Sequence, residues 1–397
     1  MEIGGHAFHR VSARWRAAYA VAVTIMLMSV WAVRLAVSTS ATDRPSGVRP
    51  LQVGAWHALG SGIEGTVFDI ATSGTDVYVG GEFNSAGGLP NTAGIARWDG
   101  SSWHALGSGL GLSVQDITIV GTDVYVAGAF TDAGGNPDAD YVARWDGSEW
   151  RAIGGGLAPF GYTVAVSGTD VYVGGSFTSA GGVLNTGHIA RWDGSKWNAL
   201  GSGLGWDAFT IAVLADGVYV GGTFINAGGN LQADRIARWD GSAWQALGNG
   251  LNGDVYAIEA VGTDVYVGGF FTDAGDIPDA DYIARWDGSN WHAVAAGLGW
   301  WVHAIAFSGS DLIVAGDFTN AGGNLAADRI ARWDGLSWQP LGSGLNTEVF
   351  ALGVVGSNVY AGGRFTRAAG DITSDYIARW SGAQHVVFLP VTLRNYP

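Results

Sequence analysis

The sequence of 397 residues contains no cysteine, only nine prolines and three methionines, and few basic residues. Without cysteine, the protein forms no disulfide and has neither a thiolate metal ligand nor a cysteine nucleophile. The low proline count and the absence of a Gly-X-Y period among the 65 glycines exclude a collagen-like chain. Hydrophobic residues make up 48% of the sequence, which argues against disorder.

Positive charge is scarce. The formal net charge is −15, and residues 42–397 hold 34 of the 35 acids but 16 of the 20 bases, which gives −18 for that segment. A strongly acidic surface repels phosphate backbones, so we expect no nucleic-acid partner. The acidity suits a soluble protein outside the cell, a bound cation or a basic partner, and we expect a monomer.

The N-terminus carries an export pattern. Arg10, Arg14 and Arg16 precede an apolar run over 17–33, and small residues at 38–41 lead into a polar stretch at 43–50. This order is typical of a signal peptide over 1–41, followed by a linker at 42–52. The alternative is a retained membrane anchor, although a run of 17 residues is slightly short for a spanning helix. Both interpretations predict an extracellular or cell-surface location, with membrane contact only through such an anchor.

The dominant feature of the sequence is a repeat of 47 residues without insertion or deletion. The unit Ile-Ala-Arg-Trp-Asp-Gly, with small variations, places its arginine at Arg97, Arg144, Arg191, Arg238, Arg285, Arg332 and Arg379. A period of this length with strand-like content is typical of a β-propeller or another repeat array.

Each unit reads as four short strands. In the first unit we predict strands over 67–72, 77–81, 95–98 and 102–106, with a long loop over 82–94. Gly74-Thr75-Asp76 and Asp99-Gly100 have the residue types that tight turns need. Four antiparallel strands per unit make one propeller blade.

Closure of the ring follows from the phase of the repeat. The segment 53–59 resembles a fourth strand without its first three, whereas the last unit, 349–380, has three strands and no fourth. We therefore predict an all-β, seven-bladed propeller over 53–382 in which the N-terminal strand completes the last blade, because open sheet edges are costly. The rival is that 385–389 fills that place.

Tryptophan supports this fold. Seven Trp occupy the Arg-Trp position and seven a Trp-x-x-Leu/Val position, and we interpret all fourteen as packing between blades. The motif Val-Tyr-Val-Gly-Gly, followed by Arg-Trp and by a second Trp five residues later, resembles the kelch repeat. The pattern is also similar to the repeats of galactose-oxidase-like propellers and of fungal cell-polarity surface proteins. This resemblance covers about 53–382 and fixes no function. The oxidase's copper site includes a cysteine-linked tyrosine, so that chemistry does not transfer.

The C-terminal segment carries a second resemblance. Residues 387–396 resemble a short tail that recurs on exported bacterial proteins, so 383–397 is a candidate sorting or attachment signal. The alternative is an ordinary terminal strand.

Two kinds of polar residue recur along the repeats and are candidates for a functional site. We interpret the repeated arginine as a structural partner of an aspartate just before the third strand, with candidates Asp140, Asp234, Asp281, Asp328 and Asp375. The aspartate of Trp-Asp-Gly is a turn residue. Acidic loops after the second strand suggest Ca²⁺ as a candidate cofactor, although solvated loop acids are common. The candidate ligands are Asp132, Asp138, Asp140, Asp273, Asp276, Asp279 and Asp281.

The departures from the repeat carry the functional prediction. Only Trp206, Trp300 and Trp301 are off-pattern outside the leader, all in the connection from a fourth strand to the next first strand. Phe160 matches Trp301 in repeat position, while His303 and Gln115 occupy a position that is aromatic elsewhere. That connection and the acidic loops share one face of an up-and-down blade, so we expect them to meet near the central channel. The ligand-binding candidates are Phe160, Trp206, Asp207, Trp300, Trp301 and His303.

From these residues we predict an exported binding or scaffold module for a carbohydrate or a protein. Aromatic side chains beside acids suit sugar stacking or a cationic group; the alternative is that they only fill the channel mouth. No nucleophile motif, phosphate loop or His-rich metal motif is present, so we expect no enzyme and name no catalytic residue. The runner-up is a glycoside hydrolase or lyase that uses acids of the same face, such as Asp207 with Glu348. A third alternative is a purely structural surface protein.

Overall fold

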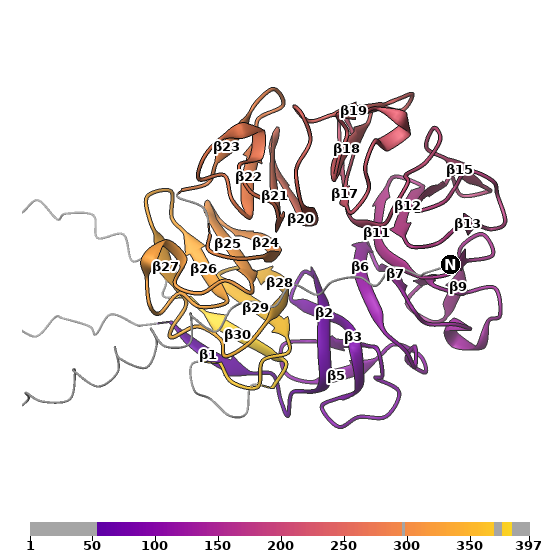
Figure 1. The fold of residues 1–397 in the computed structure, drawn as a ribbon. Coiled ribbons are helices and arrows are strands. Elements are labelled where there is room, and N and C mark those ends of the chain that lie inside the picture. Colours follow the sequence, from indigo (N-terminus) through magenta and orange to yellow (C-terminus); the bar gives the residue numbers. More distant parts are fainter. Residues whose placement is uncertain (1–53, 296–297, 369–374, 383–397) are drawn as a thin grey trace, which may run out of the picture. The chain divides into compact units, whose positions relative to one another are not determined.

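In a computed structural model of the protein, residues 54–295, 298–368 and 375–382 are described. They belong to the second of two compact units, Leu51–Pro397. Seven four-stranded antiparallel sheets stand in a ring (Figure 1), which confirms the predicted propeller. The predicted leader, the linker and the tail 383–397 lie outside the described residues. None of the helices in the described part is long and apolar enough to cross a membrane.

The first strand of each blade lines the centre of the ring, and the second strand pairs with it. The first strands are β2 (Ile63–Ser73), β6 (Val114–Val120), β11 (Gly161–Ser167), β16 (Ala208–Leu214), β20 (Asp254–Val261), β24 (Val302–Ser308) and β28 (Val349–Val355). The second strands are β3 (Asp76–Ala86), β7 (Asp123–Gly128), β12 (Asp170–Gly175), β17 (Gly217–Gly222), β21 (Asp264–Phe270), β25 (Asp311–Gly316) and β29 (Asn358–Gly363).

The third and fourth strands complete each blade toward the outside. The third strands are β4 (Ile95–Trp98), β8 (Val142–Trp145), β14 (Ile189–Trp192), β18 (Ile236–Trp239), β22 (Ile283–Trp286), β26 (Ile330–Trp333) and β30 (Ile377–Ser381). The fourth strands are β5 (Trp103–Ala105), β9 (Trp150–Ala152), β15 (Trp197–Ala199), β19 (Trp244–Ala246), β23 (Trp291–Ala293), β27 (Trp338–Pro340) and β1 (Ala55–Ala58).

The loops after the second strands carry small additional elements. Four blades have a single 3-10 turn there: η1 (Ala133–Gly135), η2 (Ala227–Gly229), η3 (Ala274–Asp276) and η4 (Ala321–Gly323). In another blade, β13 (Ser179–Ala180) lies in this loop and pairs with β10 (Leu157–Ala158), which precedes the first strand of the same blade.

The N-terminal strand closes the ring, as predicted. β1 pairs antiparallel with β30, and Trp56 lies opposite Trp380. Their rings are 5.5 Å apart at 58°, which matches the Trp98–Trp103 pair at 5.3 Å and 58°. The Trp56 indole N–H donates to the Leu341 carbonyl of the preceding blade at 2.9 Å. β2 also contacts β28, so the first and last blades are neighbours in the ring.

The core lies between the blades, because each hydrophobic cluster joins residues of neighbouring sheets. One cluster, for example, contains Val67 and Trp103 of the first blade with Tyr360 and Ile377 of the last. One phenylalanine in each blade is buried in this core. It recurs every 47 residues in the sequence, but the prediction from the sequence did not include it. Its positions are Phe83, Phe130, Phe177, Phe224, Phe271, Phe318 and Phe365.

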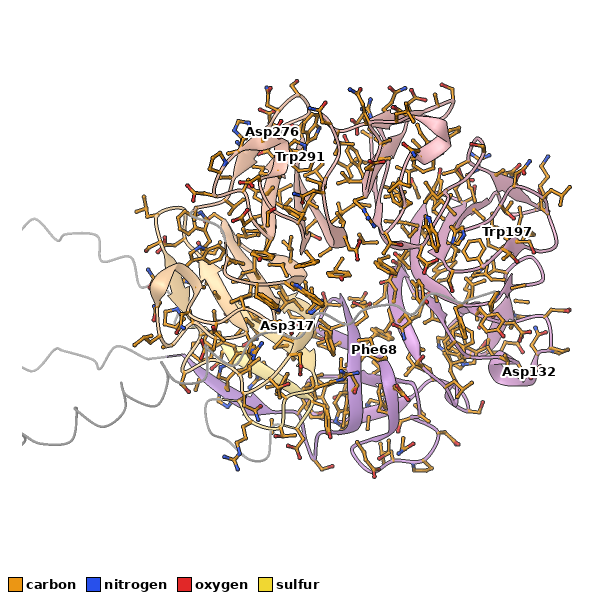
Figure 2. The ribbon with its side chains drawn as sticks, in the orientation of Figure 1. Phe68, Asp132, Trp197, Asp276, Trp291 and Asp317 are labelled. Atoms are coloured by element: carbon orange, nitrogen blue, oxygen red, sulfur yellow. The ribbon has the colours of Figure 1, made fainter. Side chains whose placement is uncertain are left out.

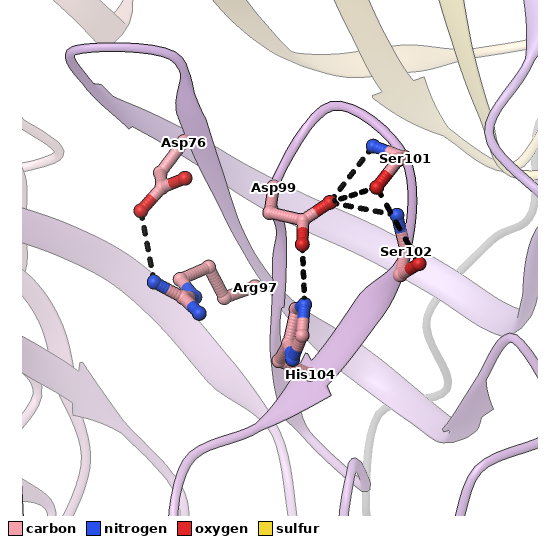
Figure 3. A network of polar contacts seen from close by, with 6 residues as sticks. All are labelled: Asp76, Arg97, Asp99, Ser101, Ser102 and His104. Atoms are coloured by element: carbon pink, nitrogen blue, oxygen red, sulfur yellow. Dashed lines mark hydrogen bonds and ion pairs between the residues drawn. The ribbon is translucent and has the colours of Figure 1, made fainter.

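The repeated arginine has a different partner from the one predicted. Arg97 pairs with Asp76, the aspartate in the turn between the first and second strands, at 2.9 Å (Figure 3). Five further blades repeat this pair at 2.5–3.4 Å. The prediction of Asp140, Asp234, Asp281 and Asp328 as partners was wrong, because those carboxylates instead accept backbone N–H groups within their own loops at 2.7–2.8 Å.

The aspartate of Trp-Asp-Gly is a turn residue, as predicted. Asp99 accepts the backbone N–H groups of Ser101 and Ser102 at 2.8 Å and contacts His104 through its second oxygen at 2.6 Å (Figure 3). The hydrogen bonds from His104 and Ser101 hold the pKa of Asp99 well below its usual range.

Candidate functional site

The loops after the second and fourth strands share one face of the ring, as predicted. Thr272, which follows β21, donates its backbone N–H to the Asn252 side chain at 2.9 Å, and Asn252 lies in the connection before β20. We call this side the loop face. The tight turns after the first and third strands, including Leu336, lie on the opposite face.

A β-bulge at the start of every first strand shapes the channel mouth on the loop face. In each of the seven blades the register with the second strand shifts by one residue at the same place. A bulged residue is unpaired and its side chain is re-aimed. Here the seven bulged side chains line one cavity of about 270 Å³. We call them the collar: Phe68, Gln115, Tyr162, Phe209, Tyr256, His303 and Phe350.

Six of the seven collar side chains are rings in contact with one another. From Tyr162 to Phe209, Tyr256, His303, Phe350 and Phe68, neighbouring ring centroids are 5.2–6.1 Å apart. Gln115 completes the circle between Phe68 and Tyr162. Figure 2 shows Phe68 directed to the centre of the ring. The collar therefore narrows the channel with an almost entirely aromatic lining.

Carboxyl groups lie next to the collar inside the channel. Asp69, Asp116 and Glu259, which we call the channel acids, line a second cavity of about 300 Å³ whose wall also includes all seven collar residues. Asp69 accepts the Ile117 backbone N–H at 2.8 Å, and Asp116 accepts the Val164 N–H at 2.7 Å. These bonds join neighbouring blades.

The channel acids hold their protons more tightly than ordinary carboxyl groups. Burial, and then the neighbouring Asp116 charge, raise the pKa of Asp69 well above its usual range. Burial is also the largest cause that raises the pKa of Asp116. Burial alone raises the pKa of Glu259 to about 7. A low local dielectric disfavours the charged carboxylate unless a cation or donors compensate it.

An exposed aromatic cluster adjoins the collar between β21 and β24. Trp300 and Trp301 stack nearly parallel with centroids 6.2 Å apart, and Trp301 lies 4.9 Å from Phe270 and 6.1 Å from Tyr256 of the collar. Trp300 is 48% exposed and Phe270 is 42% exposed. The buried indole N–H of Trp301 has no hydrogen-bond partner within the described part of the chain. The cluster thus continues the aromatic lining of the channel onto the surface.

His303, a collar residue, is anchored by an acid. Its Nε2 lies 3.2 Å from Asp317, and its ring lies between those of Tyr256 and Phe350. Of the six predicted binding residues, the structure therefore brings together Trp300, Trp301 and His303. Trp206 is 59% exposed on the loop face and takes part in none of the aromatic ring pairs of the described residues.

Phe160 and Asp207 contact a position that our sequence analysis missed. The residue just before each third strand has positive φ, at 61–65° for six non-glycine side chains. These are Tyr141, His188, Arg235, Tyr282, Arg329 and Tyr376. Such φ values are strained for residues other than glycine. The sequence signal that could have revealed this position is that its residue type varies at a fixed place in the 47-residue period.

The side chain at this position contacts a residue of complementary type at the start of the next blade: an aromatic ring meets an aromatic ring, and a basic side chain meets an acid. Tyr141 packs edge-on against Phe160 at 5.7 Å, and Tyr282 contacts Trp300 at 6.5 Å. His188 lies 3.1 Å from Asp207, and Arg235 lies 2.8 Å from Asp254. Phe160 and Asp207 therefore have partners across a blade boundary.

The acidic loops do not reach the channel, so that part of the sequence prediction was wrong. η1 contacts β9 and η3 contacts β23, both outer strands, because Gly134 and Gly275 pack against Trp150 and Trp291. Figure 2 shows Asp132 and Asp276 at the rim of the ring, away from Phe68. The loops fold outward onto the tryptophans instead of inward.

Two of the candidate Ca²⁺ ligands already accept hydrogen bonds from backbone N–H groups. Asp140 accepts the Asp132 N–H and Asp281 accepts the Asp273 N–H, both at 2.8 Å. Across the described ranges, no three His, Asp or Glu side chains are grouped for a metal ion. Asp138, Asp276 and Asp279 lie in the same loops, and Ca²⁺ binding there stays a prediction.

No protein-family model and no curated protein matches the chain. Among solved structures, the chain is similar to the WD40 β-propeller domain of Doa1, at 9% identity and a TM-score of 0.53, over 82% of this chain and 96% of that one. It is also similar to the extracellular domain of a protein described as a hybrid two-component system from B. thetaiotaomicron, at 13% identity and a TM-score of 0.51. That match covers 83% of this chain and 39% of the other. At these identities the likeness shows the propeller fold.

Proposed function

We propose that this protein is an exported binding module whose loop face, at the mouth of the channel, takes a carbohydrate or a protein. The observation that carries the proposal is the exposed Trp300 stacked on Trp301, continuous with the collar. Exposed tryptophan is costly to leave in water, and a flat pair of indoles suits a sugar ring or an apolar side chain. The kelch-like character, the export and the extracellular location belong to this proposal. One of the similar structures is an extracellular domain, which agrees with it.

The test is a glycan and protein-partner screen of the full chain, followed by single variants. We expect Trp300→Ala to weaken binding of the ligand found by at least about tenfold, since an aromatic contact residue contributes about 2 kcal/mol or more. A weaker affinity of Trp206→Ala for the same ligand would mean that the site extends to the connection before β16.

Leu336→Ala is the matched control, because Leu336 is 89% exposed on the opposite face. Equal affinities for Trp300→Ala and the unmodified protein would overturn the proposed site. Release of new reducing ends or of unsaturated products from a bound glycan would favour the carbohydrate-active enzyme.

A further inference from the structure

Two buried polar atoms next to the collar residue His303 have no hydrogen-bond partner within the described residues. They are Nε1 of Trp301, a donor, and Oδ1 of Asp317, an acceptor. The two residues are neighbours in the structure, because the Asp317 backbone N–H donates to the Trp301 carbonyl at 2.9 Å. Buried polar groups are nearly always hydrogen-bonded, so an unpaired donor and an unpaired acceptor in neighbouring residues need an explanation.

The contacts of Asp317 leave one of its oxygens available. Oδ2 lies 3.2 Å from Nε2 of His303, whereas Oδ1 lies 4.0 Å from Nη1 of Arg329, too far for a hydrogen bond. Since an ionised aspartate only accepts, His303 donates from Nε2 and keeps Nδ1 as a second acceptor beside the cavity that it lines. The side chains of His303 and Asp317 remain 15% and 17% exposed, so the pair is partly open to solvent.

The fold does not require these residue types. The place of Asp317 in the repeat is held in the other blades by Glu82, Ala129, Ser176, Thr223, Phe270 and Arg364. The place of Trp300 is held by Gly65, Leu112, Pro159, Trp206, Gly253 and Thr347. The unpaired carboxylate oxygen and the exposed indole are therefore properties of this blade and not of the propeller scaffold.

The unpaired atoms indicate the chemistry of the ligand. A hydroxyl group both donates and accepts, so hydroxyl groups can satisfy Asp317 as well as the Trp301 N–H, whereas an ammonium only donates and a carboxylate only accepts. An apolar side chain would cover both atoms and leave them unpaired, which is costly. A sugar ring carries hydroxyl groups around an apolar face, and that face can stack on Trp300, which is 48% exposed.

We propose that the loop face binds a neutral oligosaccharide, with one sugar ring stacked on Trp300 and its hydroxyl groups at Asp317, His303 and the Trp301 indole N–H. This proposal rests on the loop-face function proposed above and specifies its ligand. Nε1 of Trp301 and Oδ1 of Asp317 are covered in this structure, so binding includes a rotation of side chains there, which is common at binding surfaces. Acidic glycans are disfavoured, because Asp317 and the net charge of −15 repel carboxylates.

The experiment is calorimetric titration of the full chain with uncharged and charged hexasaccharides. The uncharged probes are cellohexaose, laminarihexaose, mannohexaose and xylohexaose, and the charged probe is hexagalacturonate. We expect at least one uncharged probe to bind, and hexagalacturonate to bind at least about tenfold more weakly than the tightest of them. Binding by none of the uncharged probes, or equal or tighter binding of hexagalacturonate, would overturn the proposal.

Variants that copy another blade test the polar contacts with residues that the fold already accepts at the same place. Asp317→Ser copies Ser176, and His303→Gln copies Gln115. We expect Asp317→Ser to weaken binding of the tightest hexasaccharide at least about tenfold, because a hydrogen bond to a charged group is lost. For His303→Gln we expect at least about a threefold loss, since a neutral hydrogen bond contributes less.

His292→Gln is the matched control. It copies Gln245 and removes another histidine–aspartate contact, that of His292 with Asp287 at 2.6 Å on an outer strand. We expect unchanged affinity for the hexasaccharide. Thermal unfolding of each variant shows that it is folded before its affinity is compared.

Trp300→Leu, which copies Leu112, separates this proposal from the loop-face function. If Trp300→Leu weakens binding of a hexasaccharide and Asp317→Ser does not, the hydroxyl contacts proposed here are wrong and the loop face stands. If no hexasaccharide binds, but a protein partner binds and loses affinity in Trp300→Leu, the carbohydrate is wrong and the loop face again stands. A hexasaccharide that binds Trp300→Leu as tightly as the unmodified protein would overturn both.

Discussion

At the scale of single residues, the most regular polar contact lies on the outer strands. The aspartate of each Trp-Asp-Gly turn accepts a donor five residues later, and the donor varies between His104, Arg151, Asn198, Gln245 and His292. Any side chain with a nitrogen donor serves, which explains why the sequence varies there. The hydrogen bond from His292 is the largest cause that lowers the pKa of Asp287 to about 2. A lowered carboxyl pKa stabilises the fold above the unfolded value, and the contribution is lost as the pH falls toward 2.

Glu259 acts in the opposite direction. Its pKa is raised from 4.5 to about 7, so the folded protein binds this proton more tightly than the unfolded chain does. The free energy of unfolding therefore falls as the pH rises from about 4.5 through 7, by about 3 kcal/mol at most. We expect Glu259→Gln to be more stable than the unmodified protein at pH 8 and to have lost part of this slope.

The measurement is urea denaturation of both proteins at pH 5 and pH 8. Glu82→Gln is the control, since Glu82 is exposed on β3. A Glu259→Gln variant with the same stability difference between the two pH values as the unmodified protein would refute a buried, unpaired carboxyl group.

At the scale of elements, the bulge and the glycine that ends the Gly-Gly or Ala-Gly pair of each second strand are one structure. A Cβ on this glycine would lie 2.0–2.3 Å from the carbonyl oxygen two residues before the bulged side chain. The residues that supply this oxygen include Phe160, Asp207, Asp254 and Trp301. Only glycine allows the backbone before the bulge to approach so closely, and the bulge in turn aims the collar into the channel.

Gly222→Ala tests this coupling. Its Cβ would meet the Asp207 carbonyl oxygen at 2.1 Å, and the backbone on both sides has to move. We expect a loss of about 1–3 kcal/mol in the free energy of unfolding, as in other overpacked sites. Gly205→Ala is the matched control, because its nearest neighbour would be at 3.8 Å and its φ is not positive. Equal denaturation midpoints for the two variants would contradict the explanation.

At the scale of the whole molecule, ring closure depends on a strand from the opposite end of the described chain. β1 belongs to the last blade, and Trp56 joins that blade to its neighbour through the Leu341 carbonyl. Five of the other outer tryptophans do the same, as in the bond from Trp244 to the Leu200 carbonyl at 3.0 Å, whereas the Trp338 indole N–H has no partner among the described residues. A closed ring has no terminal blade, so opening it exposes two blade faces at once.

We expect Trp56→Ala to cost about 3–5 kcal/mol in unfolding free energy, the range for removing a large buried aromatic side chain. Trp244→Ala, in the middle of the ring, is the matched variant and is expected to cost about the same. Chemical denaturation followed by tryptophan fluorescence measures both. A clear loss in Trp244→Ala with no loss in Trp56→Ala would mean that β1 does not hold the ring closed.

The sequence predicted well those features that repeat and depend on neighbours in the chain. Hydrophobic alternation placed the strands, and turn chemistry placed Asp99. The prediction from the sequence failed where a side chain has several possible partners of the same residue type. Asp76 and the aspartates before the third strands are equally plausible partners for the repeated arginine in sequence, and only the register of the strands decides between them. The outward fold of the acidic loops was missed because it depends on Gly134 and Gly275 packing against Trp150 and Trp291.

By itself, the 47-residue period determined the blade and the number of blades, because an unbroken repeat packs equivalent neighbours alike. It left two candidates for the missing fourth strand, and the structure decided for the N-terminal strand β1. The candidate residues Trp300, Trp301 and His303 also followed from the period, as departures from the pattern. Only the tertiary structure decided that a bulge in every blade gathers seven side chains into a collar and sets Asp69, Asp116 and Glu259 behind it. The reason is geometric: the collar residues are 47 or more positions from one another in the chain, as are the three acids, and they become neighbours only when the ring closes around its axis.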